Sequence, residues 1–234
     1  IKNQANLGFT GANNIGIRYL LGENVDYIWI LNNDTEVHPR CLEYLLKSHS
    51  DNPHLSASTA KILYPNSNTI WYGGAVLNHW SLTAHHRGEG EDDGGQYDEA
   101  KDVPFISGCC MMVKKNSFEK IGLLDDLFFS YAEDLDWCLR ANKACLTLKY
   151  VPTAIIYHKV TASVNKHKGK ISGGSSSPFA IYLTHRNRLF IIRKHSSNII
   201  QFIIAILLYG NSFVYYASGL IILRRWDKLV ALLR

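Results

Sequence analysis

The sequence offers little from which a covalent or zinc-based scaffold could be built. Its cysteines are odd in number and contain no C-x-x-C pair: Cys41, Cys109, Cys110, Cys138 and Cys145. We therefore expect neither a disulfide framework nor a structural zinc site, and a reducing compartment is favoured. No histidine lies near Cys109 or Cys110 in the sequence, so we interpret both as small buried hydrophobic residues rather than as nucleophiles.

Basic stripes interleaved with aromatic residues are also missing. The 25 lysines and arginines exceed the 20 acidic residues only slightly, which gives a formal net charge of +5. Nucleic acid is therefore not the expected partner, although the phosphates of a small substrate are compatible with this charge. There is no glycine-rich, lysine-containing triphosphate loop, which weighs against a nucleotidyltransferase.

The chain also lacks an initial methionine and a signal peptide, and we expect it to be a fragment whose beginning has been removed. Its 234 residues, 47% of them hydrophobic, suffice for one sizeable core or for a domain with an appendage. Global disorder is not expected. Helices are expected near 39–52 and 117–121, strands at 56–64, 69–72, 75–77, 103–113, 147–151 and 154–157, and a solvated, mobile loop at 83–102.

An apolar run at residues 25–31 ends abruptly in Asn32, Asn33 and Asp34. The run predicts a strand buried on both faces, as in parallel sheets that bind ligands beyond the carboxyl ends of their strands. A carboxylate at that edge suits a hard cation such as Mg²⁺ or Mn²⁺, which can bridge a protein acid and a diphosphate. The alternative is that these residues only begin a turn into the next helix.

Two glycines and two amides precede the first helical pattern, in residues 6–17. We interpret this stretch as a loop that leads into a helix. Glycine allows the backbone to approach a ligand, and a helix N-terminus offers free N–H groups to an anion, so a nucleotide site is one interpretation. The spacing is not that of the dinucleotide fingerprint, and a simple glycine-containing loop is the other interpretation.

Three acids, Glu133, Asp134 and Asp136, fall in or just before the first turn of an expected helix. They would complement the helix dipole, and they could also supply a general base whose pKa is tuned by its neighbours. Asp134 and Asp136 are two positions apart and cannot share a helix face, so at most one points at a given substrate atom. Further along, His158 ends a strand, where it is either structural or a metal ligand.

The C-terminal part of the chain, from residue 166 onward, differs in composition from the part before it. The basic segment 166–170 and the Gly/Ser-rich segment 173–177 form either a linker or a lid over phosphates. Residues 199–223 contain no charged side chain and are long enough to cross a bilayer, although a buried or in-plane hairpin is the alternative. Basic residues on both flanks suit an anionic membrane surface but leave the orientation open.

Taken together, four motifs and His158 resemble the family 2 glycosyltransferases, in particular the bacterial rhamnosyltransferase-like members. The motifs are NLGFTGANN at 6–14, LNNDTEV at 31–37, SGCCM at 107–111 and EDLDWCLR at 133–140. The resemblance covers about residues 1–165 and implies the α/β GT-A nucleotide-diphosphosugar fold, a mixed, mainly parallel sheet with flanking helices, with C-terminal hydrophobic helices appended. We expect a GT-A domain at 1–170, a flexible linker at 171–178 and a helical, membrane-associated segment at 179–234.

The resemblance also implies roles for individual residues. The D-x-D motif of the family falls on Asn32, Asn33 and Asp34, so Asp34 would carry the contact to Mg²⁺ or Mn²⁺. The catalytic base falls on Asp134 and a further metal ligand on His158. Further contacts fall on two groups of residues: donor contacts on Gly11, Asn13 and Asn14, and candidate acceptor contacts on Ser107, Gly108, Glu133 and Trp137.

The implied reaction moves a sugar, for which rhamnose is one candidate, from a nucleotide diphosphate to a glycan or lipid-linked hydroxyl, with inversion. The family begins with a strand, a helix and a second strand that carry nucleobase contacts, and this chain starts after them, so we expect the fragment alone to be inactive. The expected location is the cytoplasmic side of a bacterial or archaeal membrane. The rival interpretation is a non-catalytic, membrane-anchored module that binds a sugar nucleotide or glycan.

Overall fold

The computed structural model describes residues 1–159 and 177–234, which form two compact units. The first unit comprises Ile1–Leu77 and Ala84–Lys159, and the second comprises Asn78–Thr83 and the described residues from 177 onward. The predicted basic segment 166–170 and most of the predicted linker 171–178 lie outside the described residues. The end of that predicted linker is already structured, because Ser177 caps the helix that starts at Pro178.

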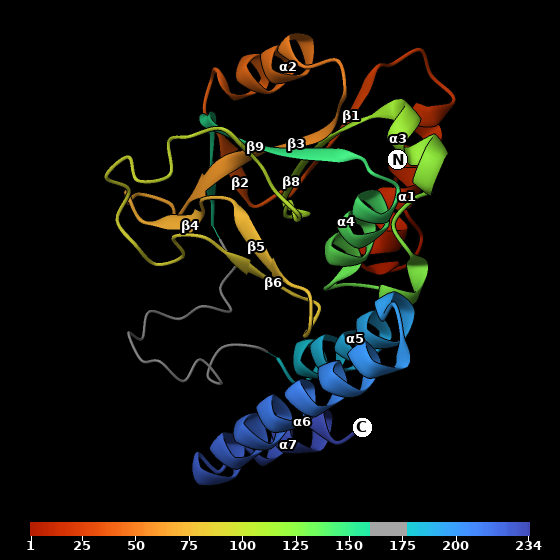
Figure 1. The fold of residues 1–234 in the computed structure, drawn as a ribbon, viewed down its shortest axis with the longest axis vertical. Coiled ribbons are helices and arrows are strands. Elements are labelled where there is room, and N and C mark those ends of the chain that lie inside the picture. Colours follow the sequence, from red (N-terminus) through yellow and green to blue (C-terminus); the bar gives the residue numbers. More distant parts are fainter. Residues whose placement is uncertain (160–176) are drawn as a thin grey trace. The chain divides into compact units, whose positions relative to one another are not determined.

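A seven-stranded sheet forms the centre of the first unit (Figure 1). Its main path runs β1-β8-β3-β9-β2, with β4 added to β3 and β7 added to β9. The strands are β1 (Tyr27–Leu31), β2 (Thr35–Val37), β3 (Leu55–Leu63), β4 (Ile70–Tyr72), β7 (Lys101–Asp102), β8 (Cys110–Lys114) and β9 (Thr147–His158). The strands β5 (Ala75–Asn78) and β6 (Thr83–His86) pair with each other in a separate hairpin.

The sheet is mixed, as expected, but its directions differ from a mainly parallel arrangement. Strands β3 and β9 run parallel in the longest ladder, whereas the other described pairs of this sheet are antiparallel. Strand β1, the starting point of the prediction, is antiparallel to β8 and alternates between buried and half-buried residues. An apolar run indicates that a strand is buried, but it does not indicate the direction of its neighbours. Helices can cover both faces of a sheet whether its strands are parallel or antiparallel.

Four helices and a short 3₁₀ turn surround this sheet: α1 (Gly8–Leu21), α2 (Cys41–Asp51), α3 (Lys115–Ile121), η1 (Asp126–Phe128) and α4 (Glu133–Lys143). Helix α2 packs on β3 and β9, while α1, α3 and α4 gather at another side of the sheet (Figure 1). All nine residues of β3 are buried, which makes this strand the middle of the core. The chain thus adopts the predicted α/β fold.

Two sequence expectations about local structure need correction. The stretch 6–17 is not a loop before a helix, because α1 already begins at Gly8, whose φ is +69°. The strands expected on either side of Pro152 are one strand, β9, in which pairing with β3 jumps from Val151 to Ile155. The three residues left out of the pairing form an irregularity that accommodates proline without ending the strand.

The region expected to be a solvated loop, 83–102, is partly ordered by pairing and by charge. It contributes β6 and β7, and two of its acids pair with a buried lysine. Lys61 of β3 is only 2% exposed and forms ion pairs with Asp93, at 2.8 Å, and with Asp98. A buried lysine requires such partners, because an uncompensated charge inside a protein is costly.

Three helices make up most of the described second unit: α5 (Pro178–His195), α6 (Ile199–Ile222) and α7 (Trp226–Leu232). They share a small core centred on Ile181, Leu220 and Leu232. Among the described residues, α6 is the helix long and apolar enough to cross a membrane, and only 6% of its most apolar window is buried. By length and composition alone this is weak support for a membrane span.

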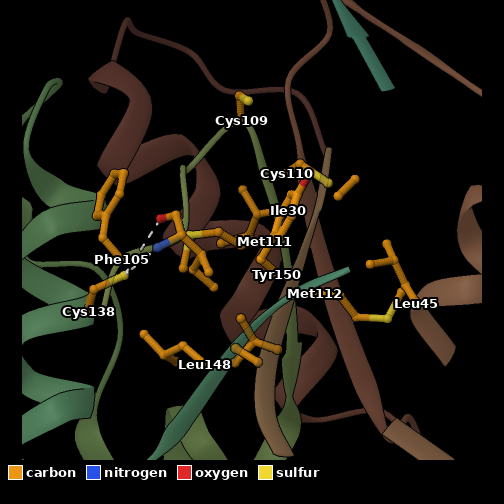
Figure 2. Close-up of a cluster of buried hydrophobic side chains, with 14 of the residues drawn as sticks. Ile30, Leu45, Phe105, Cys109, Cys110, Met111, Met112, Cys138, Leu148 and Tyr150 are labelled. Carbon is orange, nitrogen blue, oxygen red and sulfur yellow. Dashed lines mark hydrogen bonds between the residues drawn. The ribbon is translucent and has the colours of Figure 1, made fainter. Parts of the chain in front are cut away.

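Cys109 and Cys110 are buried like small hydrophobic residues, as predicted. Cys41, Cys109, Cys110 and Cys138 are buried, Cys145 is exposed, and all five are free thiols. Figure 2 shows Cys110 and Cys138 among the aliphatic and aromatic side chains of the core. Burial raises the pKa of these buried thiols, which keeps them protonated and unreactive.

Candidate active site

The end of β1 brings Asp34 to His158, at the end of β9. Strand β2 pairs with β9 so that Thr35 lies opposite His158, and the residue before Thr35 therefore meets the imidazole. The Oδ1 atom of Asp34 lies 3.1 Å from Nε2 of His158. The amide of Asn32 lies 3.5 Å from the same nitrogen, and Asn33 is exposed beside this group. The hydroxyl of Thr35 donates to the carbonyl oxygen of Asn32 at 2.6 Å, which fixes the turn.

The imidazole of His158 contacts an aromatic side chain that the sequence motifs did not reveal. The Trp71 ring of β4 meets it edge to face at 4.9 Å, and the same indole contacts His86 at 4.5 Å. The Nδ1 atom of His158 is buried without a hydrogen-bond partner. Burial lowers the pKa of His158 and Asp34 partly opposes this, so the neutral, metal-binding form is favoured at neutral pH. The sequence around Trp71, which is followed by Tyr72 and two glycines, gave no signal for this contact.

The second carboxylate of the site, Asp134, is held by backbone N–H groups at the start of α4. Its Oδ2 atom accepts a hydrogen bond from Gly108 N at 2.9 Å, and its Oδ1 atom accepts one from Leu135 N at 2.8 Å. A side chain at position 108 would lie 3.3 Å from Asp134 Cβ, so glycine permits this close approach. Burial raises the pKa of Asp134, and the two N–H donors partly counteract that rise.

The turn 107–109 connects the two carboxylates. The carbonyl oxygen of Cys109 accepts a hydrogen bond from Asn32 N at 3.1 Å, while the neighbouring Gly108 N donates to Asp134. Burial is the main cause of the raised pKa of the Cys109 thiol, and the negative charges of Asp134 and Asp34 add to it, so both acids lie within electrostatic reach of that side chain. The structure thus brings Asn32, Asp34, Gly108, Asp134 and His158 into one region.

The other acids of α4 point elsewhere, which confirms that Asp134 and Asp136 do not share a face. Asp136 is fully buried and accepts a hydrogen bond from Arg140 Nε at 2.9 Å, and Arg140 also donates to the carbonyl oxygens of Ile121 and Leu123. Glu133 is 6% exposed, and its Oε2 atom has no hydrogen-bond partner. Burial, reinforced by the charge of Asp134, raises the pKa of Glu133 to about 8.

The residues expected at the donor lie on α1 rather than on a loop. Gly11 is half-buried, and Asn13 donates to the carbonyl oxygen of Phe9 in its own helix at 2.8 Å. Asn14 is fully buried and donates to the carbonyl oxygen of Leu124 and to Asp126. These hydrogen bonds give Asn14 a structural role, because they hold α1 against Leu124 and the start of η1. The α1 start lies near the acid site, because Phe9 Cε1 would be 3.5 Å from a side chain at position 108.

Two of the expected acceptor residues are occupied by packing. Trp137 is fully buried, packs with its ring tilted against Phe118 and donates from Nε1 to the carbonyl oxygen of Gly122 at 3.2 Å. Burial of the whole indole makes Trp137 a core residue, which corrects its expected place on the acceptor side. Ser107 is 4% exposed, and its hydroxyl accepts from Cys109 N within its own turn. The tryptophan that lies beside His158 is instead Trp71.

The donor set fits a divalent cation shared with a substrate. Within residues 1–159 and 177–234, no group of three or more His, Cys, Asp or Glu side chains gathers as a metal cage. Asp34 and His158 offer one carboxylate and one imidazole, and a buried Nδ1 without a hydrogen-bond partner leaves Nε2 as the nitrogen that meets the acid. Mg²⁺ and Mn²⁺ commonly take one or two protein ligands and complete their shell with phosphate oxygens and water.

Comparison with known proteins gives the family context of this geometry. Residues 1–122 match the glycosyl transferase family 2. The chain is 26% identical over 193 residues to the low-salt glycan biosynthesis hexosyltransferase Agl10 of Haloferax volcanii, covering 80% of this chain and 58% of that protein. It is 28% identical over 210 residues to the N-acetylglucosaminyl-diphospho-decaprenol L-rhamnosyltransferase of Mycobacterium tuberculosis, covering 78% and 66%.

A third relative is the dTDP-rhamnosyl transferase RfbF of Shigella flexneri, 26% identical over 191 residues, covering 81% of this chain and 61% of that protein. The chain therefore spans about three fifths of the length of these relatives. Among solved structures, a crystal structure of GalNAc-T7 with UDP, GalNAc and Mn²⁺ aligns with a TM-score of 0.54 at 18% identity. That alignment covers 68% of this chain and 31% of the other, and it supports the GT-A-like fold alone.

Proposed function

The chain belongs to the glycosyl transferase family 2, and we propose that it transfers a sugar from a nucleotide diphosphate to an acceptor hydroxyl with inversion. The observation that carries this proposal is the pair of carboxylate sites joined by the turn 107–109. One site, Asp34 with His158, suits the donor diphosphate, and the other, Asp134, suits the acceptor hydroxyl.

Asp134 is the proposed general base. As the acceptor oxygen forms its bond to the anomeric carbon, the bond from that carbon to the diphosphate oxygen breaks, and the hydroxyl proton passes to the Asp134 carboxylate. Two backbone N–H bonds orient this carboxylate before substrate binds. Its raised pKa brings it closer to neutrality, where a general base is more effective.

Asp34 and His158 are the proposed ligands of Mg²⁺ or Mn²⁺, with Asn32 and Asn33 beside them. The cation would offset the negative charge that develops on the leaving diphosphate. The neutral imidazole of His158 leaves Nε2 available for such a role. Gly11 and Asn13 are the proposed donor contacts on α1, while Asn14 holds that helix in place.

Rhamnose is our proposed donor sugar, because two of the relatives are named as rhamnosyl transferases. The proposed acceptor is a glycan or a lipid-linked glycan at the cytoplasmic side of the cell membrane. The apolar helix α6 supports a membrane location, and the name of the mycobacterial relative includes a decaprenol-linked acceptor.

The experiment that tests this proposal uses the full-length protein. Calorimetric titration with UDP, GDP and dTDP, with and without Mn²⁺, would identify the nucleotide. Transfer would then be measured with the corresponding L-rhamnose donor and a synthetic diphospho-polyprenol glycan. Metal-dependent binding followed by transfer supports the proposal, whereas tight nucleotide binding with neither transfer nor hydrolysis would assign the chain to a non-catalytic binding module.

A further inference from the structure

The helices of the second unit pack through the middle of α6. The ring of His185 on α5 lies 5.8 Å from Phe213 and 5.3 Å from Tyr216, and its Nδ1 atom lies 3.2 Å from the Tyr209 hydroxyl oxygen. These three aromatic residues lie around the centre of the 24-residue helix. One face of α6 is therefore covered by protein over its central turns.

The opposite face of α6 is exposed and mostly apolar, and its exposed polar residues are Asn211 and Ser218. At about 100° per residue, its exposed large hydrophobic residues fall on about one half of the helix circumference. They are Ile199, Ile200, Ile203, Leu207, Leu208, Val214, Tyr215, Ile221 and Ile222. Leu207 is 67% exposed, while Ala205 and Leu220, on the other side, are buried. An exposed patch of this kind marks an interaction surface.

Charged residues beside the central contact argue against a membrane-spanning α6. Arg186 and Arg188 follow His185, the α5 residue that contacts the middle of α6, and Arg188 donates to the carbonyl oxygen of Leu82 at 2.7 Å. Spanning would carry both guanidinium groups, and the Leu82 carbonyl oxygen that Arg188 contacts, into the hydrocarbon core of the bilayer. Each arginine there costs about 2.5–3.5 kcal/mol or more.

We propose that α6 and α7 lie in the plane of an anionic membrane surface, with the exposed apolar face of α6 inserted and α5 on the aqueous side. This deepens the proposed membrane association by specifying its geometry. Two exposed tryptophans support it, Trp80 at 57% and Trp226 at 56%. Trp80 follows His79, whose carbonyl oxygen accepts a hydrogen bond from Gln201 near the start of α6, while Trp226 begins α7. Tryptophan at both ends of the helix suits the membrane interface.

The basic residues near this face favour an anionic lipid membrane as its partner. Arg193 and Lys194 near the end of α5, and Arg224 between α6 and α7, are exposed. Each basic residue near an anionic surface contributes about 1 kcal/mol of attraction. An apolar helix face, with basic residues before and after the helix and interfacial tryptophans, is typical of helices that lie on membranes rather than through them.

The first test is vesicle co-sedimentation of the full-length protein with phosphatidylcholine vesicles, with and without phosphatidylglycerol. We expect binding that increases with the anionic lipid. Leu207→Glu should reduce the partition coefficient about tenfold or more, because burying one leucine contributes about 1.5–3 kcal/mol. Leu42→Glu is the matched control, since Leu42 is an exposed leucine on α2. Equal binding of the two variants would overturn the proposal.

The second test distinguishes lying on the membrane from crossing it. Cysteines are placed at the exposed positions Ser197 and Asp227, before and after α6, in a Cys145→Ser background that removes the exposed thiol. We expect an impermeant maleimide to label both sites from the same side of sealed membrane vesicles. Labelling from opposite sides would show that α6 spans and would overturn the in-plane geometry.

These tests use no donor or acceptor, so their failure is separate from a failure of the proposed transfer reaction. The alternative partner for the apolar face is a second copy of the chain. Absence of vesicle binding, combined with a concentration-dependent dimer that Leu207→Glu abolishes, would overturn the proposal in favour of that self-association.

Discussion

The Nε2 atom of His158 lies 3.1 Å from Oδ1 of Asp34, although 124 positions separate the two residues in the chain. The antiparallel pairing of β2 with β9 places Thr35 opposite His158 and thereby brings the preceding acid to the imidazole. On the other side of the turn 107–109, Gly108 N holds Asp134 at 2.9 Å.

Asp34→Asn should lower the Mn²⁺-dependent affinity for nucleotide by about tenfold or more, because it removes the charged oxygen ligand while keeping the size of the side chain. Titration calorimetry with and without Mn²⁺ measures this. Glu36→Gln is the control, since Glu36 is an exposed acid two positions away on β2. Equal metal dependence in wild type and Asp34→Asn would remove Asp34 from the metal site.

Asp134→Asn should reduce the rate of transfer about 10²- to 10⁴-fold, which is the usual contribution of a positioned general base. Nucleotide affinity should stay near that of the wild type, because Asp134 is proposed to face the acceptor. Initial rates and calorimetry on the same samples separate the two effects, and Asp102→Asn, at an exposed position of β7, is the control. A loss of nucleotide binding as large as the loss of rate would contradict the assignment.

Glu133→Gln should stabilise the protein increasingly as the pH rises from about 5 to about 8. The pKa of Glu133 is raised from 4.5 to about 8 in the folded state, so over this range the unfolded chain binds fewer protons at this site. Wild-type stability therefore falls with rising pH from this group, and glutamine removes that dependence. Thermal melts of both proteins across this pH range provide the measurement. Parallel curves would show that Glu133 ionises normally in the folded protein.

Asp93→Asn should destabilise the first unit more than Asp98→Asn, although both acids pair with Lys61. The Asp93 side chain is 13% exposed and that of Asp98 is 64% exposed, while Lys61 is 2% exposed. We expect about 2–3 kcal/mol for Asp93→Asn, because a buried charge loses its less exposed partner. Asp98→Asn should cost less than about 1 kcal/mol, as for a solvent-screened pair. Urea unfolding compares the two, and equal costs would refute this ranking.

Gly8→Ala and Gly16→Ala should change stability in opposite directions, although both lie in α1. A Cβ at position 8 would lie 2.3 Å from the Phe129 carbonyl oxygen, on a backbone with φ of +69°. We expect a cost of at least about 1–2 kcal/mol there. A Cβ at position 16 meets nothing within 4 Å, so alanine should stabilise the helix by about 0.5–1 kcal/mol. Urea unfolding of both variants tests this, and a neutral Gly8→Ala would refute the proposed strain.

Short-range periodicity along the chain was enough to predict the local features of the fold. The sequence predicted the strand ending before Asn32, the helix with Asp134 and Asp136 on different faces, and the burial of Cys109 and Cys110. It also contained, in four short motifs, the resemblance that the family match of residues 1–122 confirms. Alternating or helical spacing reports which side of an element is buried, and neighbours along the chain suffice for that.

Contacts between residues far apart in the chain could not be predicted in this way and follow from the three-dimensional packing. The start of α1 at Gly8 depends on the space beside Phe129, and the burial of Lys61 depends on acids more than 30 positions away. Trp71 contacts His158, whereas Trp137 is buried in the core. Such contacts follow from strand register and from the order of strands in the sheet, which are set by packing over the whole domain and leave no trace in local periodicity.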